Sequence, residues 1–409
     1  MILQRYSIRF LLISLYASFI YTTTAQIQER VYWTDPSIQP DKKGELSIEV
    51  DNLSFFKNNE YEGKFQTGWT LPGFWLQVKA VYYPLDNIKL EAGVHSMVYW
   101  GADKYPTYAY KDIAQWKSNS YHHGARVLPY LRAQVALSDN VNIILGDIYG
   151  KANHNLIEPL YSPELNLTAD PEAGLQLLYT SRFVDLDSWV NWESFIFKND
   201  YHQEAFTFGI SSRVKFNDPE SPLHVYMPVQ ALAQHRGGEI DTIYVNSVQT
   251  LMNGSIGAGV TWNTNRPLFK RMNAEVDMVG YYQQAGELWP FDNGSGVYAR
   301  LSADIYDFRV KTSYWTCKEF ISMFGSPFYG SVAMWEEGLT FERPKVIYIG
   351  AEYSRSFGKG YALGIEVDLY NSLSMYGNSP EGRVKIEGSK NFAAAIYLRI
   401  NPSFLLKKF

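Results

Sequence analysis

The sequence predicts an all-β fold, an antiparallel up-and-down barrel of about 16 strands, within a range of about 14 to 18. Three observations predict it: apolar and polar side chains alternate along most of the chain, short turns alternate with long connections, and aromatic residues gather near predicted strand ends. Aromatic residues make up 16% of the 409 residues and charged residues only 19%, below the roughly 25% usual for soluble domains. This composition excludes a disordered chain.

The first 25 residues have the pattern of a secretory signal peptide. Arg5 and Arg9 lead into an apolar stretch from Phe10 to Ile20, and small residues follow as far as Ala25. We therefore predict a signal peptide over 1–25, a short periplasmic N-terminal segment over 26–43 and the barrel over 44–409. The segment 26–43 is too short to fold as a plug domain inside the barrel. The single cysteine excludes an intramolecular disulfide.

Strand periodicity runs through the barrel region. In residues 74–82 the apolar positions alternate with a second set of side chains, which is the period of a strand with one apolar face. The pattern recurs in 88–98, 131–137 and 206–216. The clearest hairpin spans 297–315, where a two-residue turn makes Ile305 and Phe308 cross-strand neighbours and keeps both apolar stripes on one face.

The connections between the predicted strands fall into two groups. Short turns such as Asp86-Asn87 and Asp139-Asn140 are typical of hairpins. The long polar or aromatic connections cover roughly residues 101–124, 150–170, 283–294, 316–345 and 371–388. Short periplasmic turns and long extracellular loops are characteristic of a transmembrane barrel.

A soluble β-sandwich also alternates, so alternation alone does not separate the two folds. The signal peptide, the asymmetry of the connections and the aromatic residues near strand ends favour a transmembrane barrel, because Trp and Tyr form girdles at membrane interfaces. The aromatic residues assigned to these girdles are Trp75, Tyr82, Trp100, Trp262, Tyr281, Tyr282 and Trp315.

On these features, and on the terminal Phe409, the chain resembles Gram-negative outer-membrane β-barrel proteins of the porin type over residues 44–409. The resemblance implies location in the cell outer membrane, contact with outer-membrane lipid, and recognition of the C-terminal strand by the barrel-assembly machinery. Such barrels are often trimers, so a homo-oligomer is an open possibility. Pro402 and the Lys407-Lys408 pair disturb the final alternation, which predicts that the last strand ends near Ser403.

A barrel of about 16 strands encloses a lumen wide enough for water unless loops fill it. Strand parity directs charges of both signs inward, as in selective pores. The inward residues are Lys79, Lys89, Glu91, Arg132, Arg213, Lys215, Arg300, Asp304, Arg309, Lys311, Glu352, Glu366 and Asp368. The first hypothesis is therefore a channel for passive diffusion of small hydrophilic solutes. A salt-bridged interior without flux is the other interpretation of the same charges.

The second hypothesis is a barrel that conducts no ions or solutes and instead binds or retains surface polysaccharide. In this it would resemble the outer-membrane barrels of the capsule-assembly type. Aromatic side chains in the long connections offer faces on which sugars stack. The candidate glycan contacts are Tyr108, Tyr110, Trp116, Trp289 and Trp335. The same side chains are also suited to covering the barrel mouth or packing inside it.

No enzyme, metal site or cofactor is indicated by the sequence. Barrel ester hydrolases use Ser and His at outward strand positions, but no Ser/His/Asp or Ser/His/Asn set recurs at a spacing that aligns on neighbouring strands. His154, His202 and His235 fall in or beside predicted loops, and His122-His123 point to opposite faces of an extended chain. The net charge of -5, without a basic run, excludes a nucleic-acid partner.

Overall fold

The computed structural model describes residues 27–100, 124–195, 203–238 and 248–409, apart from positions 265, 267, 335 and 359. Within these residues the main sheet closes on itself as an antiparallel barrel of 16 strands. The predicted fold class and strand number are thereby confirmed. No helix in the described part of the chain is long and apolar enough to cross a membrane.

Long strands make up the wall of the barrel, and the helices of the described residues are short. The barrel strands are β1 (Glu45–Glu60), β2 (Thr70–Leu85), β3 (Ile88–Tyr99), β4 (Gly124–Ser138), β5 (Val141–Asp147), β6 (Ala173–Thr180), β7 (Val184–Ser194), β8 (Ala205–Lys215), β9 (Leu223–Arg236), β10 (Gln249–Asn263), β11 (Phe269–Ala285), β12 (Asn293–Ile305), β13 (Phe308–Lys318), β15 (Lys345–Gly358), β16 (Tyr361–Ser372), β19 (Ser389–Ile400) and β20 (Ser403–Lys408). A separate sheet comprises β14 (Thr340–Phe341), β17 (Met375–Ser379) and β18 (Gly382–Ile386). The helices are η1 (Gln28–Tyr32), η2 (Pro40–Lys42), η4 (Lys151–His154), α3 (Leu165–Thr168) and η5 (Pro327–Tyr329).

From β1 to β19, which are 16 strands, each barrel strand pairs with the next, and β1 closes the barrel by pairing with both β2 and β19. The predicted hairpin is present as β12 and β13, with Ile305 opposite Phe308. Strands β19 and β20 together form the sixteenth position of the wall, because both pair with β1. The prediction that the last strand ends near Ser403 is wrong: Pro402 lacks a backbone N–H and interrupts the ladder, but pairing resumes from Ser403 to Lys408.

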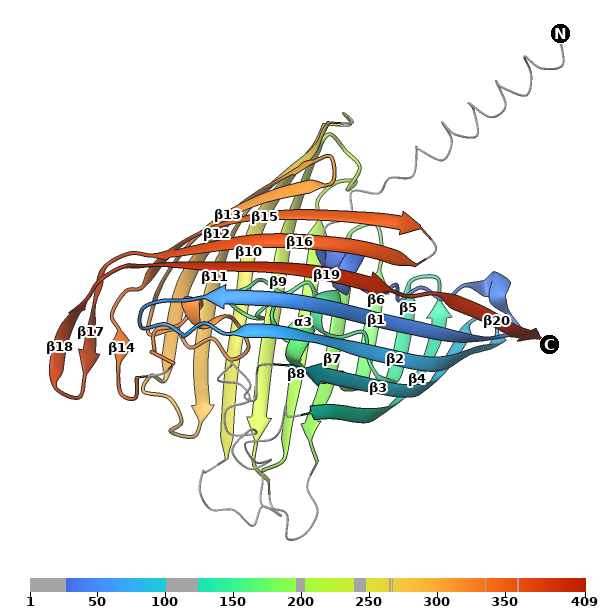
Figure 1. Ribbon diagram of the computed structural model, residues 1–409, viewed down its shortest axis with the longest axis horizontal. Helices are drawn as coiled ribbons and strands as arrows, with labels where there is room; N and C mark the ends of the chain where they lie inside the picture. The colour runs from blue at the N-terminus through green and yellow to red at the C-terminus, as the bar shows by residue number, and fades with distance from the viewer. Residues whose placement is uncertain are drawn as a thin grey trace.

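The two ends of the barrel differ as expected. Short turns join strands at the periplasmic end, and the long connections lie at the extracellular end, which we call the outer rim. In Figure 1 the β17–β18 hairpin stands clear of the barrel at one end and the C-terminal strand β20 lies at the other. The strands β1, β2, β16 and β19 form the near wall in this view, in front of β9 to β11.

The two faces of the wall carry different side chains. On β11, Val276 and Met278 point outward and are 51% and 69% exposed, whereas Glu275 and Asp277 point inward and are buried. An apolar outer face and a polar inner face are the pattern of a barrel in lipid. Among the predicted girdle residues, Tyr82, Trp100, Trp262 and Tyr282 do not point into the core, but Trp75, Tyr281 and Trp315 are buried inside. Their assignment to a girdle is wrong because their positions have inward parity.

Candidate functional site

The charges that parity directs inward lie on the inner face and mostly bond to one another. Glu91 lies 2.7 Å from both the Lys79 and the Lys89 ammonium groups and 3.4 Å from Arg132. The remaining inward residues have these partners: Arg213 over the Tyr226 ring, Lys215 with Asp185, Arg300 with Glu275, Asp304 with Arg309 and Arg271, Lys311 with Glu352, Glu366 with Lys57, and Asp368 with Tyr348. Their role in ion selectivity stays a prediction.

The first segment that fills the lumen is the β5–β6 insert, residues 148–172. Strands β5 and β6 are only 7 and 8 residues long, so the chain leaves the wall early and turns inward. Its apolar residues Ile157, Leu160 and Leu165 are fully buried. Gln230 of β9 holds the insert by donating to Asn155 O at 2.9 Å and accepting from Ile157 N at 3.0 Å.

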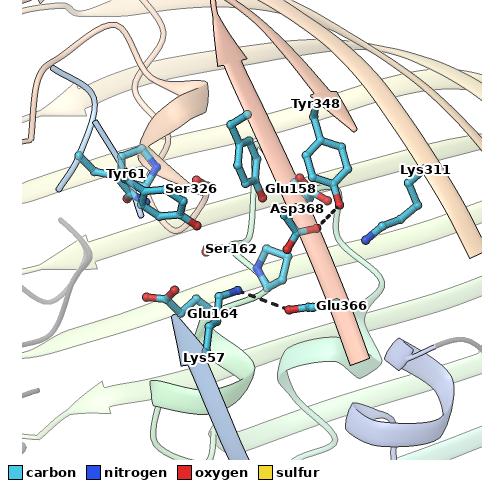
Figure 2. Close-up of a pocket in the computed structure, with 14 residues that line it drawn as sticks. Lys57, Tyr61, Glu158, Ser162, Glu164, Lys311, Ser326, Tyr348, Glu366 and Asp368 are labelled. Atoms are coloured by element: carbon cyan, nitrogen blue, oxygen red, sulfur yellow. Dashed lines mark hydrogen bonds and ion pairs between the residues drawn. The ribbon is translucent and has the colours of Figure 1, made fainter. Parts of the chain in front are cut away.

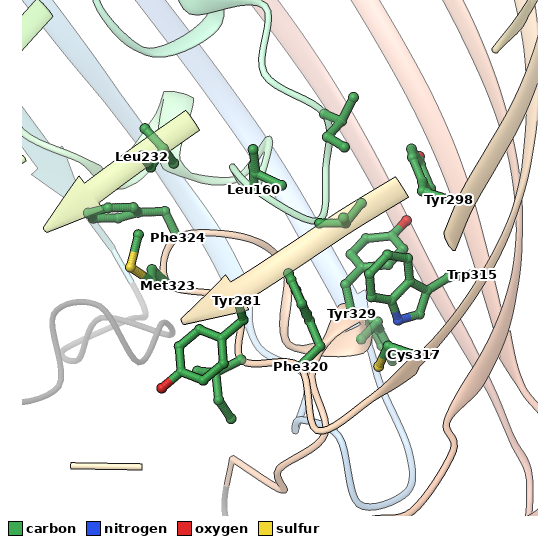
Figure 3. Close-up of a cluster of buried hydrophobic side chains, with 14 of the residues drawn as sticks. Leu160, Leu232, Tyr281, Tyr298, Trp315, Cys317, Phe320, Met323, Phe324 and Tyr329 are labelled. Carbon is green, nitrogen blue, oxygen red and sulfur yellow. The ribbon is translucent and has the colours of Figure 1, made fainter. Parts of the chain in front are cut away.

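The second is the β13–β14 insert, residues 319–339, which packs against the first. The backbone of Tyr161 bridges to that of Phe324, and the Tyr329 hydroxyl donates to Glu158 at 2.6 Å. Figure 3 shows Phe320 and Tyr329 of this insert among Tyr281, Tyr298 and Trp315 of the wall, with Leu160 of the β5–β6 insert nearby. The contact forms one continuous apolar cluster inside the barrel.

The N-terminal residues 27–34 also pack inside the wall. Ile27 and Val31 are buried with Leu53 and Tyr397. The Arg399 guanidinium donates to the carbonyl oxygens of Val31 and Trp33 at 3.0 and 2.6 Å. Part of the segment predicted to be periplasmic therefore lies inside the barrel, where a single turn of helix packs against β1 and β19. The domain boundaries at 25 and 43 stay predictions, and residues 1–26 lie outside the described residues.

A cavity of about 30 Å³ remains between the inserts and the wall. In Figure 2 the Lys57 ammonium points to Glu366 and the Tyr348 hydroxyl to Asp368, and Glu158, Ser162 and Glu164 of the β5–β6 insert also line the cavity. A cavity of this volume has room for about two water molecules. The two inserts and the N-terminal turn pack inside the barrel around this cavity, and this packing favours the interpretation without flux.

One histidine fixes the β5–β6 insert to the wall. His154 lies with Nδ1 2.7 Å from Asp187 and Nε2 2.9 Å from Glu172, and its ring is stacked on Trp189 at 3.5 Å. Burial by itself lowers the pKa of His154, but the two carboxylates outweigh burial and raise the pKa to about 9. The imidazole is therefore charged at neutral pH and acts as a structural ion rather than as a base.

A different histidine stands on the outer face of the wall, near the outer rim. Strand pairing places Trp192, Phe206, His235 and Thr250 directly opposite one another on β7, β8, β9 and β10. The Trp192 and Phe206 rings are stacked at 5.2 Å, and the Phe206 ring is 5.2 Å from the His235 ring. The Thr250 hydroxyl lies 2.9 Å from His235 Nδ1. All four positions have outward parity, because their neighbours Gln234, Arg236 and Gln249 are buried inside.

This pair of a base and a hydroxyl was missed by sequence reasoning for a physical reason. The connection between His235 and Thr250 is long and irregular in composition. The sequence therefore does not predict which residue of β10 pairs with His235 of β9. The available signal was parity: Val229, Ala231 and Ala233 precede His235 at outward positions of the same strand. That alternation places His235 on the lipid side but does not name its partner.

The predicted glycan contacts are described only at Trp289. Its side chain packs against the apolar cluster of the inserts, beside Ile321 and Met323, and is half-buried rather than presented to solvent. Tyr108, Tyr110, Trp116 and Trp335 lie outside the described residues. None of the predicted contacts among the described residues is therefore an exposed aromatic side chain, and glycan binding stays a prediction.

Within the residues that the structure describes, no three His, Cys, Asp or Glu side chains are grouped so that they would hold a metal ion. Cys317 is a buried thiol whose sulfur lies 3.4 Å from the Ser331 hydroxyl. It forms part of the contact between β13 and the β13–β14 insert.

The closed strand order, the apolar outer face and the polar interior define an outer-membrane β-barrel protein, located in the cell outer membrane and surrounded by its lipid. The chain belongs to the lipid A 3'-O-deacylase-type family, whose model matches residues 38–409. The family name refers to an enzyme and so points toward catalytic activity, where the sequence alone indicated none. No curated protein matches the chain.

Several solved barrels are similar in outline. OccAB2 of Acinetobacter baumannii has 10% identity and a TM-score of 0.47, covering 91% of this chain and 100% of that one. OprD of Pseudomonas aeruginosa has 9% identity and a TM-score of 0.46, covering 88% and 94%. OmpT of Vibrio cholerae, solved in a trimer form, has 9% identity and a TM-score of 0.46, covering 88% and 99%. Similarity this low carries no argument about function.

Proposed function

We propose that this protein is an outer-membrane ester hydrolase that removes an ester-linked acyl chain from a lipid A-type glycolipid of the outer leaflet. The observation that carries the proposal is the contact between His235 and Thr250 on the lipid-facing side of the wall. Membership of the lipid A 3'-O-deacylase-type family supplies the substrate class. The filled lumen is consistent with a reaction at the outer, lipid-facing surface of the barrel.

The position of the pair suits a lipid ester. His235 is the second-last residue of β9 and Thr250 the second residue of β10, at the outer rim. Acyl esters of a glycolipid lie at the junction between sugar and hydrocarbon, which is also the depth that Trp prefers at a membrane interface. Trp192 and Phe206, in line with His235, are suited to pack against the sugar ring or the first carbons of the acyl chain.

The chemistry follows from a base beside a hydroxyl. As Thr250 Oγ1 attacks the ester carbonyl, its proton passes to His235 Nδ1. The tetrahedral intermediate collapses by breaking the bond to the sugar oxygen, which takes the proton from His235. Water, deprotonated by the same nitrogen, then cleaves the acyl-threonine to release the fatty acid and restore the hydroxyl. The sum of the steps is ester plus water to acid plus alcohol.

The test uses the refolded protein in mixed micelles with purified lipid A, with released fatty acid and the mass of the product measured by mass spectrometry. We expect hydrolysis by the parent protein, a loss of roughly 10² to 10⁴-fold in His235→Gln and Thr250→Ala, and substantial activity in Thr250→Ser, which keeps a hydroxyl. The product mass identifies which acyl chain is lost, the 3'-O chain being the expected one.

The matched control is His95→Gln, which changes a buried histidine on the inner face of β3. Its activity per folded molecule should equal that of the parent. A folded parent protein that releases no acid from lipid A, or variants at His235 and Thr250 that remain as active as His95→Gln, would overturn the proposal.

A further inference from the structure

The outer rim carries a set of lysines on the part of the wall from β13 to β19, away from the His235–Thr250 pair. Lys318 ends β13, Lys345 begins β15 and Lys390 lies near the start of β19. All three are exposed, and their inward neighbours Cys317, Val346 and Asn391 are buried, so the lysines have outward parity. Asn371 of β16 stands opposite Lys390, between it and β15.

These lysines lie at the end of a lipid-facing stripe. Below them, the outward positions of the same strands are apolar and exposed, as at Tyr314, Ile349 and Ile396. A lysine at the end of such a stripe extends its ammonium group to the level of the lipid headgroups. The three ammonium groups are therefore placed where the phosphates of outer-leaflet lipid lie.

Among the described residues, ion pairs engage only part of the set. Lys318 has one contact, 3.4 Å from the exposed Glu319, and no ion pair is described for Lys345 or Lys390. Two acids near the rim have other partners: Glu342 accepts from Arg383 at 2.6 and 2.9 Å, and Glu60 accepts from Asn58 at 2.8 Å.

The lysines are also confined to one region. On the remaining described strands, the outward positions at the outer rim are apolar or carry uncharged or acidic groups, for example Val127, Trp192, Thr250 and Tyr282. If the lysines served only solubility, we would expect them at strand ends all around the rim, since every strand end there meets the same solvent. The clustering on β13, β15 and β19 indicates a specific anionic contact.

We propose that Lys318, Lys345 and Lys390 form a binding edge for the phosphate groups of an outer-leaflet glycolipid. The choice of a lipid A-type ligand rests on the proposed function, whereas binding at this edge does not require catalysis. We assign this edge to the phosphate of a lipid, because the apolar stripe directly below it is suited to acyl chains and not to a free anion.

The experiment measures lipid binding to the His235→Gln protein in detergent micelles by native mass spectrometry, which keeps the ligand intact whether or not the parent is a hydrolase. The probes are bisphosphorylated lipid A and the same lipid after phosphatase treatment. We expect the phosphorylated form to bind more tightly. Replacement of the three lysines by Gln should weaken its binding by roughly fivefold per lysine, with little change for the dephosphorylated form.

The control replaces Lys64, on the β1–β2 connection, and Lys385, on β18, by Gln, because these exposed lysines already face Glu336 and Glu387. The control should bind both lipids like the parent. Equal binding of the two lipid forms, an equal loss in the control, or displacement of the lipid by millimolar inorganic phosphate would each overturn the proposal. Because hydrolysis plays no part, loss of the hydrolase proposal leaves this result interpretable.

Discussion

His154 and His235 lie on opposite sides of the same barrel wall, and their neighbours differ in charge. His154 is buried in the lumen between two carboxylates and a parallel indole ring. His235 stands on the lipid side with a neutral hydroxyl and an aromatic edge as neighbours. Two fixed anions favour the charged form of an imidazole, whereas the proposed hydrolysis requires a nitrogen that accepts a proton from the Thr250 hydroxyl. Residue type alone therefore did not indicate the role.

Exchange of the two histidines for glutamine gives the sharpest test of this contrast. We expect His235→Gln to lose roughly 10² to 10⁴-fold in lipid A hydrolysis, whereas His154→Gln retains the parent rate per folded molecule. The double variant His235→Gln/Thr250→Ala should be no slower than either single variant, because the two groups act as one unit. Rates that multiply in the double variant would show that the two residues act independently.

The stability ranking should be the reverse of the activity ranking. His154→Gln leaves the carboxylates of Asp187 and Glu172, which are only 12% and 10% exposed, without the His154 cation, so we expect a loss of about 3–5 kcal/mol in the free energy of unfolding. His235→Gln changes a partly exposed position and should alter it by less than about 0.5 kcal/mol. Urea unfolding in detergent micelles, followed by tryptophan fluorescence, measures both. Equal midpoints for the two variants would contradict the structural role of His154.

A glycine supports the stacked position of Trp189. A Cβ at Gly209, directly opposite on β8, would meet the indole ring of Trp189. Gly209→Ala should displace the ring from His154 and cost about 1–3 kcal/mol of stability, measured by the same urea titration. The matched control is Gly280→Ala on the outer face of β11, where a Cβ would meet nothing within 4 Å; a comparable loss there would indicate a backbone effect instead.

The stability of the barrel should also depend on pH through His154. Its pKa in the folded state is raised to about 9, above the value of about 6.5 expected in the unfolded chain. The contribution of this group is therefore complete below about pH 6.5 and is lost as the pH rises through about 9. Urea midpoints of the parent should fall between pH 6.5 and 9.5 more steeply than those of His154→Gln. Parallel curves would assign the pH dependence to other groups.

The smallest expected effect is on ion conductance. Because the inserts fill the middle of the lumen in the described residues, we expect no stable conductance steps from the folded, heat-modifiable protein in a planar bilayer. Arg132→Ala, Arg300→Ala and Arg309→Ala should be equally silent. Stable steps with a selectivity that shifts toward cations in these variants would restore the passive diffusion channel as the primary function.

Much of the architecture was predictable because it depends on local alternation. The period of two along 74–82 and 206–216, and the turn between Ile305 and Phe308, fix strand identity and register over a few residues. The inward direction of charges such as Glu91 and Asp368 follows from the same parity. The inward course of the inserts was not predictable, since the composition of residues 148–172 and 319–339 does not indicate whether a long connection extends into solvent or folds into the lumen.

The sequence by itself determined that this chain forms a membrane barrel, which residues belong to the wall, and which face of each strand meets lipid. These properties depend on side-chain alternation between near neighbours. Only the tertiary structure decided that the lumen is filled, that His154 meets Asp187 and Glu172, and that His235 stands beside Thr250. Each of these contacts joins residues separated by irregular connections or by strands paired across the sheet. Their proximity depends on the register and closure of the whole barrel, which no local pattern encodes.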